Sequence, residues 1–166
     1  MATITLKGNQ IYTVGNLPAI GSTAPDFKFT KTDLSDDHLK NYSGKRVILN
    51  IFPSLDTSVC AASVRKFNVE AAKLRNTVIL AISKDTPFAH KRFCTVEGIE
   101  SVIPASLIRN DKFGIEYGVQ IAEGGMAGFM SRAVIILNEQ GKVIYSEQVP
   151  EIGQEPDYDK ALKVLQ

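Results

Sequence analysis

Cys60 and the loop before it are the part of this sequence whose residue types could do chemistry. The thiol follows an apolar run that ends at Phe52-Pro53, and it falls in the first turn of a helix predicted over Ser58 to Asn76. A thiol at a helix N-terminus lies beside free backbone N–H groups, whose field favours the thiolate. Because the thiolate is the nucleophilic form of cysteine, this placement predicts a reactive Cys60.

Three further residues could assist that thiolate. The Thr57 hydroxyl can accept from and donate to a small polar substrate, and Pro53, which has no N–H, can cover one side of the sulfur. Arg132 precedes a predicted strand and could supply a cation. A thiol with a lower pKa gives a thiolate that is a weaker nucleophile. The residues around the sulfur must therefore supply most of any rate acceleration. Each also has a structural interpretation, Thr57 as the N-cap of the helix and Arg132 as a strand-end residue that faces water.

Short runs rich in β-branched residues predict the sheet that must position this loop. Three of them are typical of strands buried on both faces, namely Val47 to Phe52, Val78 to Ile82 and Ala133 to Leu137. The helix predicted between the first two completes a right-handed βαβ unit. Turn residues at 138–141 make 133–137 and 142–148 an antiparallel hairpin, so the sheet is predicted to be mixed.

Flanking elements complete the α/β architecture. A second helix should begin at Pro87, after the capping residues Asp85 and Thr86, and should end at Gly98. The runs 3–6 and 11–14 predict an N-terminal β-hairpin, and 157–165 predicts a closing helix.

Composition narrows the class of protein. The chain has 166 residues, 44% of them hydrophobic and 22% charged, which predicts one globular domain over 1–166. A net charge of +1 argues against nucleic acid or a membrane surface as the main partner. Two cysteines do not make a disulfide framework, and neither a signal sequence nor an apolar run longer than five residues is present. We therefore expect a cytoplasmic protein.

A metal site is a weaker interpretation of the cysteines and histidines. His90 and Cys94 lie four residues apart on one helical face, a spacing that suits a metal ion. A closed zinc site needs four ligands, and only His38 and Cys60 remain among the usual nitrogen and sulfur donors. We therefore expect no metal and no cofactor, and we expect His90 to face solvent.

Pro53, Thr57 and Cys60 fit the motif P-x-x-x-T-x-x-C, and with this motif the chain resembles the peroxiredoxin family. Further matches resemble its atypical two-cysteine branch, the bacterial thiol peroxidases; they lie at 59–61, 63–68, 87–89, 91–94 and 131–134. The resemblance covers nearly the whole chain, including the first hairpin and the segment Val149-Pro150-Glu151-Ile152. It implies a thioredoxin-like fold, a homodimer, and reduction of hydroperoxides with electrons from thioredoxin.

The resemblance also implies a role for each matched residue. Cys60 would be the peroxidatic cysteine, which becomes a sulfenic acid, and Cys94 the resolving cysteine, which condenses with it to form an intrachain disulfide. Thr57 and Arg132 would bind the peroxide and polarise the O–O bond, while Pro53 shields the sulfur. Cysteines on separate helices do not meet the Cα separation of about 4.4 to 6.8 Å that a disulfide needs. We therefore expect local unwinding of one or both helices during turnover.

The stretch 124–130 departs from the family pattern. Met126, Phe129 and Met130 could line an apolar mouth for organic peroxides, or could be core or dimer contacts. A glycine-rich nucleotide loop is not expected there, because the glycines do not follow a strand in the required register.

A second interpretation of function also fits the cysteines. A thioredoxin-like sensing or binding module would form the same disulfide as a signal, without turnover. A general thioredoxin-type oxidoreductase is disfavoured, since the chain has no C-x-x-C pair.

Overall fold

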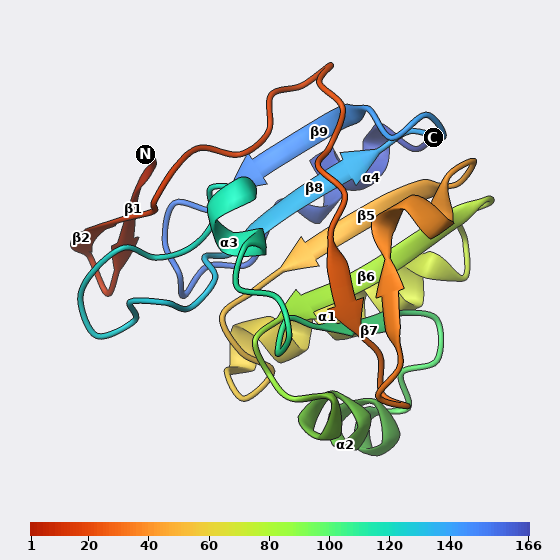
Figure 1. The fold of residues 1–166 in the computed structure, drawn as a ribbon, viewed down its shortest axis with the longest axis horizontal. Coiled ribbons are helices and arrows are strands. Elements are labelled where there is room, and N and C mark those ends of the chain that lie inside the picture. The colour runs from red at the N-terminus through yellow and green to blue at the C-terminus, as the bar shows by residue number, and fades with distance from the viewer.

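A seven-stranded mixed sheet forms the centre of the fold in the computed structural model, which describes residues 1–166 (Figure 1). Its strand order is β4-β3-β7-β6-β5-β8-β9. The bounds are β3 (Lys28–Thr30), β4 (Asp36–His38), β5 (Arg46–Ile51), β6 (Thr77–Ser83), β7 (Ile103–Ser106), β8 (Ala133–Leu137) and β9 (Val143–Gln148). The strands β5, β6 and β7 run parallel and the other pairs are antiparallel, which confirms the predicted mixed sheet.

Side chains along the central strands point alternately to the two faces of the sheet, and each face has its own hydrophobic core. From β5, the side chains of Val47, Leu49 and Ile51 enter one cluster, whereas Ile48 enters the other. All four are buried, because both faces of β5 are covered. This double burial explains why four of the six residues of the strand are aliphatic; the other two are Arg46 at its start and the buried Asn50.

Five helical segments cover the sheet. They are α1 (Ser58–Ala71), α2 (Pro87–Glu97), α3 (Phe113–Glu116), α4 (Tyr158–Lys163) and a 3-10 helix over Leu39–Tyr42. The Thr86 hydroxyl accepts from the Ala89 N–H and Gly98 closes α2 with φ 66°, so both predicted ends of that helix are confirmed. The prediction that α1 reaches Asn76 is wrong: the helix ends at Ala71, and Asn76 has φ 49°.

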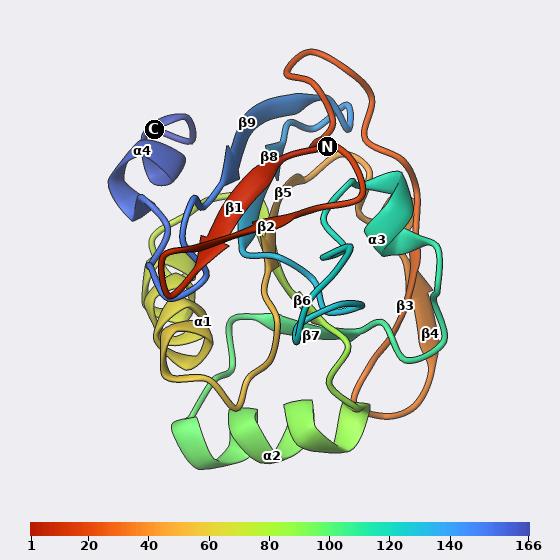
Figure 2. The same ribbon diagram turned by 90° about the vertical axis from the view of Figure 1, so that its left-hand side faces the viewer.

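The N-terminal hairpin lies apart from the large sheet. It consists of β1 (Thr3–Leu6) and β2 (Asn9–Tyr12), joined by a two-residue turn in which Lys7 and Gly8 both have positive φ. This is the geometry of the tight turns that match the twist of a hairpin. The predicted hairpin is confirmed, with its second strand two residues earlier than expected. Thr5 also pairs with Glu151, so the hairpin rests against the segment that follows β9 (Figure 2).

None of the helices is both long enough and apolar enough to cross a membrane.

Candidate active site

Cys60 lies in the first turn of α1, at the end of the loop that leaves β5. Its side chain is fully buried, in the core cluster that also contains Phe52 and Val64, and its thiol is free. Pro53 is buried as well. The strand-to-helix connection predicted from the sequence therefore delivers the sulfur into a closed, apolar setting at a helix N-terminus.

Arg132 is brought directly to that sulfur. It precedes β8, which pairs with β5, and its Nη1 donates to Cys60 Sγ at 3.2 Å. Its Nε donates to the Ile152 carbonyl at 2.9 Å, and only 1% of the residue is exposed. The alternative of an arginine that faces water is therefore wrong.

No carboxylate compensates this buried guanidinium. Arg132 is absent from the ion pairs within 4.0 Å, although taking an ion out of water costs several kcal/mol in a protein. The one side chain within hydrogen-bond distance of the guanidinium is Cys60, through its sulfur. A cation held at this sulfur can stabilise negative charge that develops there during a reaction.

Thr57 is the N-cap of α1. Its Oγ1 accepts from the Cys60 N–H at 3.4 Å and donates to the Ser54 carbonyl at 3.1 Å. The residue is exposed. Its hydroxyl oxygen keeps one further acceptor lone pair, on the solvent side of the loop that holds the sulfur.

Asp85, in the connection between β6 and α2, holds this loop, a role that the sequence did not indicate. Its carboxylate accepts from Ser54 Oγ and the Leu55 N–H, both at 2.8 Å, and from Ser83 Oγ at 2.6 Å. A residue between a strand and Pro87 is typical of a helix cap, but Thr86 is the cap here. No local pattern could have shown contacts that span 30 residues.

His90 does not face solvent, so that prediction is wrong. It is 1% exposed, and its Nε2 lies 3.1 Å from Ser83 Oγ, which also contacts Asp85. Burial lowers the pKa of His90 to about 4, with the charge of Asp85 acting in the opposite direction. One polar network thus joins the Cys60 loop to α2, the helix that carries Cys94.

The buried His90 predicts a loss of stability in mild acid. Its pKa is near 6.5 when unfolded, so below pH 6.5 the unfolded chain takes up a proton that the folded chain refuses until about pH 4. Between pH 7 and 5 this costs about 2 kcal/mol, or roughly 4 to 8 °C in Tm. Thermal unfolding of His90→Gln should show most of that loss removed. His38→Gln, at the half-exposed second histidine, should retain it, and equal pH slopes in all three proteins would contradict the assignment.

Cys94 lies on α2 and packs, half-buried, against the core cluster that contains Cys60. Burial raises the pKa of its thiol. Arg92 of the same helix pairs with Asp56 in the Cys60 loop at 3.0 Å, across the surface. The two helices are therefore neighbours, tied by this ion pair and by the Asp85 network.

The three apolar residues of the 124–130 stretch lie in different surroundings. Met130 is 1% exposed in the core that contains Phe113, and Met126 packs beside Ile4 and Ile121. Phe129 is 42% exposed. The structure does not bring the three together as one lining, and a role in substrate binding stays a prediction.

No three side chains of the usual metal-binding types gather closely enough to hold an ion.

A buried cysteine at a helix N-terminus, faced by an arginine on a mixed sheet, defines a thiol-based redox protein of thioredoxin-like fold. The chain belongs to the Redoxin family, whose sequence model matches residues 19–162. It is 56% identical over 165 residues to thiol peroxidases of Mycobacterium bovis and Mycobacterium tuberculosis, with 99% of each chain covered. These matches confirm the predicted resemblance to bacterial thiol peroxidases.

Solved structures agree on the fold. A peroxiredoxin-like protein from Aquifex aeolicus superimposes with a TM-score of 0.94 at 36% identity, covering 99% of this chain and 96% of the other. A thiol peroxidase from Chromobacterium violaceum gives 0.91 at 22% identity, covering 99% and 95%. The predicted thioredoxin-like peroxiredoxin fold with an N-terminal hairpin is confirmed.

Proposed function

We propose that this chain is a thiol-dependent peroxidase that reduces hydrogen peroxide and organic hydroperoxides through Cys60. The observation that carries the proposal is the 3.2 Å contact between Arg132 Nη1 and Cys60 Sγ in a fully buried setting. Membership of the Redoxin family and 56% identity to thiol peroxidases support it.

In the first step, the Cys60 thiolate attacks the terminal oxygen of the peroxide. The S–O bond forms as the O–O bond breaks, giving a Cys60 sulfenic acid and an alkoxide or hydroxide that takes a proton to leave as alcohol or water. Arg132 stabilises the negative charge as it moves from sulfur to the leaving oxygen. Thr57, whose own proton is engaged by Ser54, accepts the peroxide O–H and so orients the substrate.

In the second step, the Cys94 thiolate attacks the sulfur of the Cys60 sulfenic acid: the S–S bond forms as the S–O bond breaks, and the departing hydroxide takes a proton from solvent to leave as water. Cys60 is buried behind the first turn of α1, so this step requires α1 or α2 to unwind. The contacts that must open are the Asp56–Arg92 ion pair and the bonds of Asp85 and His90. Thioredoxin, a dithiol protein, then returns both cysteines to thiols in a reducing cytosol.

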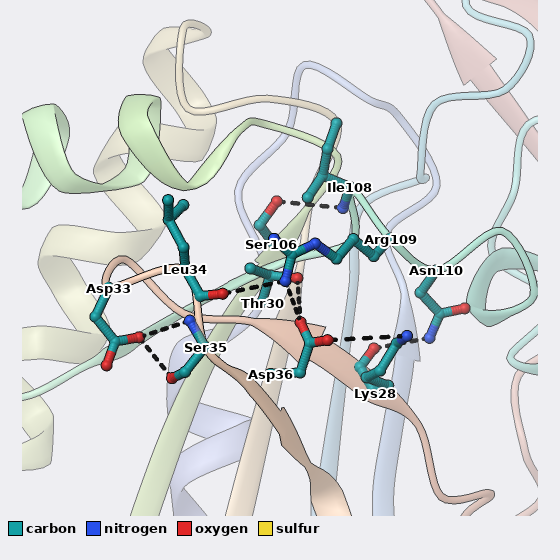
Figure 3. Close-up of polar contacts among 10 residues, drawn as sticks. All are labelled: Lys28, Thr30, Asp33, Leu34, Ser35, Asp36, Ser106, Ile108, Arg109 and Asn110. Carbon is teal, nitrogen blue, oxygen red and sulfur yellow. Dashed lines mark hydrogen bonds and ion pairs between the residues drawn. The ribbon is translucent and has the colours of Figure 1, made fainter.

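We also propose a homodimer, in which the partner is a second copy of this chain. The support is two exposed apolar side chains on bonded segments: Leu34 and Ile108 are 42% and 51% exposed. Arg109 joins their segments, donating to the Leu34 carbonyl and to Asp36 (Figure 3). Burying such side chains against a copy of themselves favours association.

Light scattering tests the dimer. We expect a mass near twice 18.2 kDa for the wild type, and near 18.2 kDa for Ile108→Asp. Ile20→Asp, a control at a more exposed isoleucine on a loop, should remain dimeric. A wild-type monomer at all concentrations would end this part of the proposal.

Turnover tests the function. With thioredoxin, thioredoxin reductase and NADPH, the protein should consume many equivalents of cumene hydroperoxide or hydrogen peroxide per chain. One equivalent followed by a halt would instead indicate the sensing module that forms the same disulfide.

A further inference from the structure

The side chain of Arg132 is aimed at Cys60 by a single main-chain carbonyl. Its guanidinium makes two hydrogen bonds within the protein, one to Cys60 Sγ and one to the carbonyl of Ile152. The position of that carbonyl therefore decides where the charge points, since no carboxylate holds the group.

The N-terminal hairpin holds Ile152 in place. The Ile152 N–H donates to the Thr5 carbonyl at 2.9 Å, and the Thr5 N–H donates to the Pro150 carbonyl at 2.7 Å. Residues 150–152 thus extend the edge of β1 in parallel. The side chain of Ile152 is buried against Ile4 of β1 and Ile121.

Glu151 fastens the two segments together. Its carboxylate accepts from the Thr5 hydroxyl, and from the backbone N–H groups of Lys7 and Gly8 at 2.9 and 3.2 Å. The positive φ angles of Lys7 and Gly8 turn both N–H groups toward one anion. These bonds, the one from Thr5 first, lower the pKa of Glu151 to about 2, so the carboxylate is ionised throughout the working range of pH.

We propose that Glu151 and Thr5 are positioning residues for the peroxidase reaction, because they clamp the hairpin to residues 150–152 and so hold the carbonyl that aims Arg132 at Cys60. The inference rests on the proposed function. Neither residue touches the sulfur, and the effect passes through the Ile152 carbonyl and Arg132. A misplacement of about 1 Å caused by a distant change can cost a reaction up to about a hundredfold.

The test uses Cys94→Ser protein, in which Cys60 is the only thiol. Adding Glu151→Gln should slow oxidation of Cys60 by hydrogen peroxide by about tenfold, and Thr5→Val by about threefold. The second readout is the pH dependence of Cys60 alkylation by iodoacetamide. Its acid limb should move to higher pH by about half a unit or more in both variants, because the thiolate loses part of its cation. Burial and the hydrogen bond to Glu155 raise the pKa of Tyr158, so this hydroxyl does not titrate in the same range.

Two matched controls separate this role from a general loss of stability. Thr3→Val changes the same face of β1 without touching Glu151, and Asp159→Asn neutralises an exposed carboxylate of α4. Both should stay within twofold of the parent in both readouts.

A lower Tm with an unmoved acid limb would overturn the inference, and so would oxidation rates within twofold in folded Glu151→Gln and Thr5→Val. If Glu151→Gln fails to fold, the oxidation rate and the alkylation profile of Thr5→Val decide whether the inference holds. Alkylation does not depend on peroxide chemistry. If the wild-type protein does not react with peroxide, the proposed function is rejected. A shift in the pH profile of Cys60 alkylation in the two variants would still support the positioning role.

Discussion

Replacing Cys60 by serine is expected to abolish peroxide consumption. A serine hydroxyl stays protonated near neutral pH, so the variant lacks the anion that attacks the peroxide and that balances the buried Arg132. The measurement is peroxide consumption by the pre-reduced protein, with oxidation followed by mass spectrometry. Equal peroxide reactivity in the wild type and Cys60→Ser would end the assignment.

Cys94→Ser is the companion variant. It should react with one equivalent of peroxide at the wild-type rate and then stop, because the sulfenic acid has no thiol with which to condense. Excess peroxide should carry Cys60 on to the sulfinic acid. Sustained turnover of Cys94→Ser with thioredoxin would show that Cys94 is not the resolving cysteine.

Arg132→Gln is expected to give the second largest effect. If the guanidinium stabilises charge that moves off the sulfur, its loss costs about 2 to 4 kcal/mol in the chemical step, which is roughly thirty- to nine-hundredfold in rate. The rate constant for Cys60 oxidation in a single turnover measures it directly. The Tm should change little, because the substitution also removes a buried charge that has no carboxylate partner.

Arg46→Gln is the matched control for this variant. Arg46 also donates to main-chain carbonyls, those of Leu165 and Arg75, but it begins β5 at the end of the strand opposite the Cys60 loop. Its oxidation rate should equal that of the wild type. A loss below about tenfold in Arg132→Gln would leave Arg132 with a structural role alone.

The central elements could be predicted because their own side chains define them. Continuous apolar runs identified β5, β6 and β8, and a cap, a proline and a glycine marked the ends of α2. The strands β3, β4 and β7 were not predicted, since each has only three or four residues and β4 is Asp-Asp-His. β3 and β4 pair with each other, β3 meets β7 at the single pair Thr30 and Ser106, and β7 pairs with β6, so these strands are defined by pairing and not by a pattern in their own side chains.

In the candidate site, some residues are placed by the local sequence and others by contacts with residues far away in the chain. The placement of Cys60 and the cap at Thr57 follow from the order of strand, loop and helix. Arg132 could be named from the sequence as a candidate cation, but its distance from Cys60 depends on the pairing of β5 with β8, which no local pattern shows. His90 was misjudged because its partner, Ser83, belongs to a strand and not to its own helix.

The clamp between Thr5 and Glu151 joins residues 146 positions apart. During synthesis, nearly the whole chain must therefore leave the ribosome before the segment that orients Arg132 can meet its hairpin. A nascent chain would carry Cys60 without its properly aimed cation. If the clamp orients Arg132, full reactivity of Cys60 toward peroxide would thus arise only after residues 150–152 have paired with the hairpin.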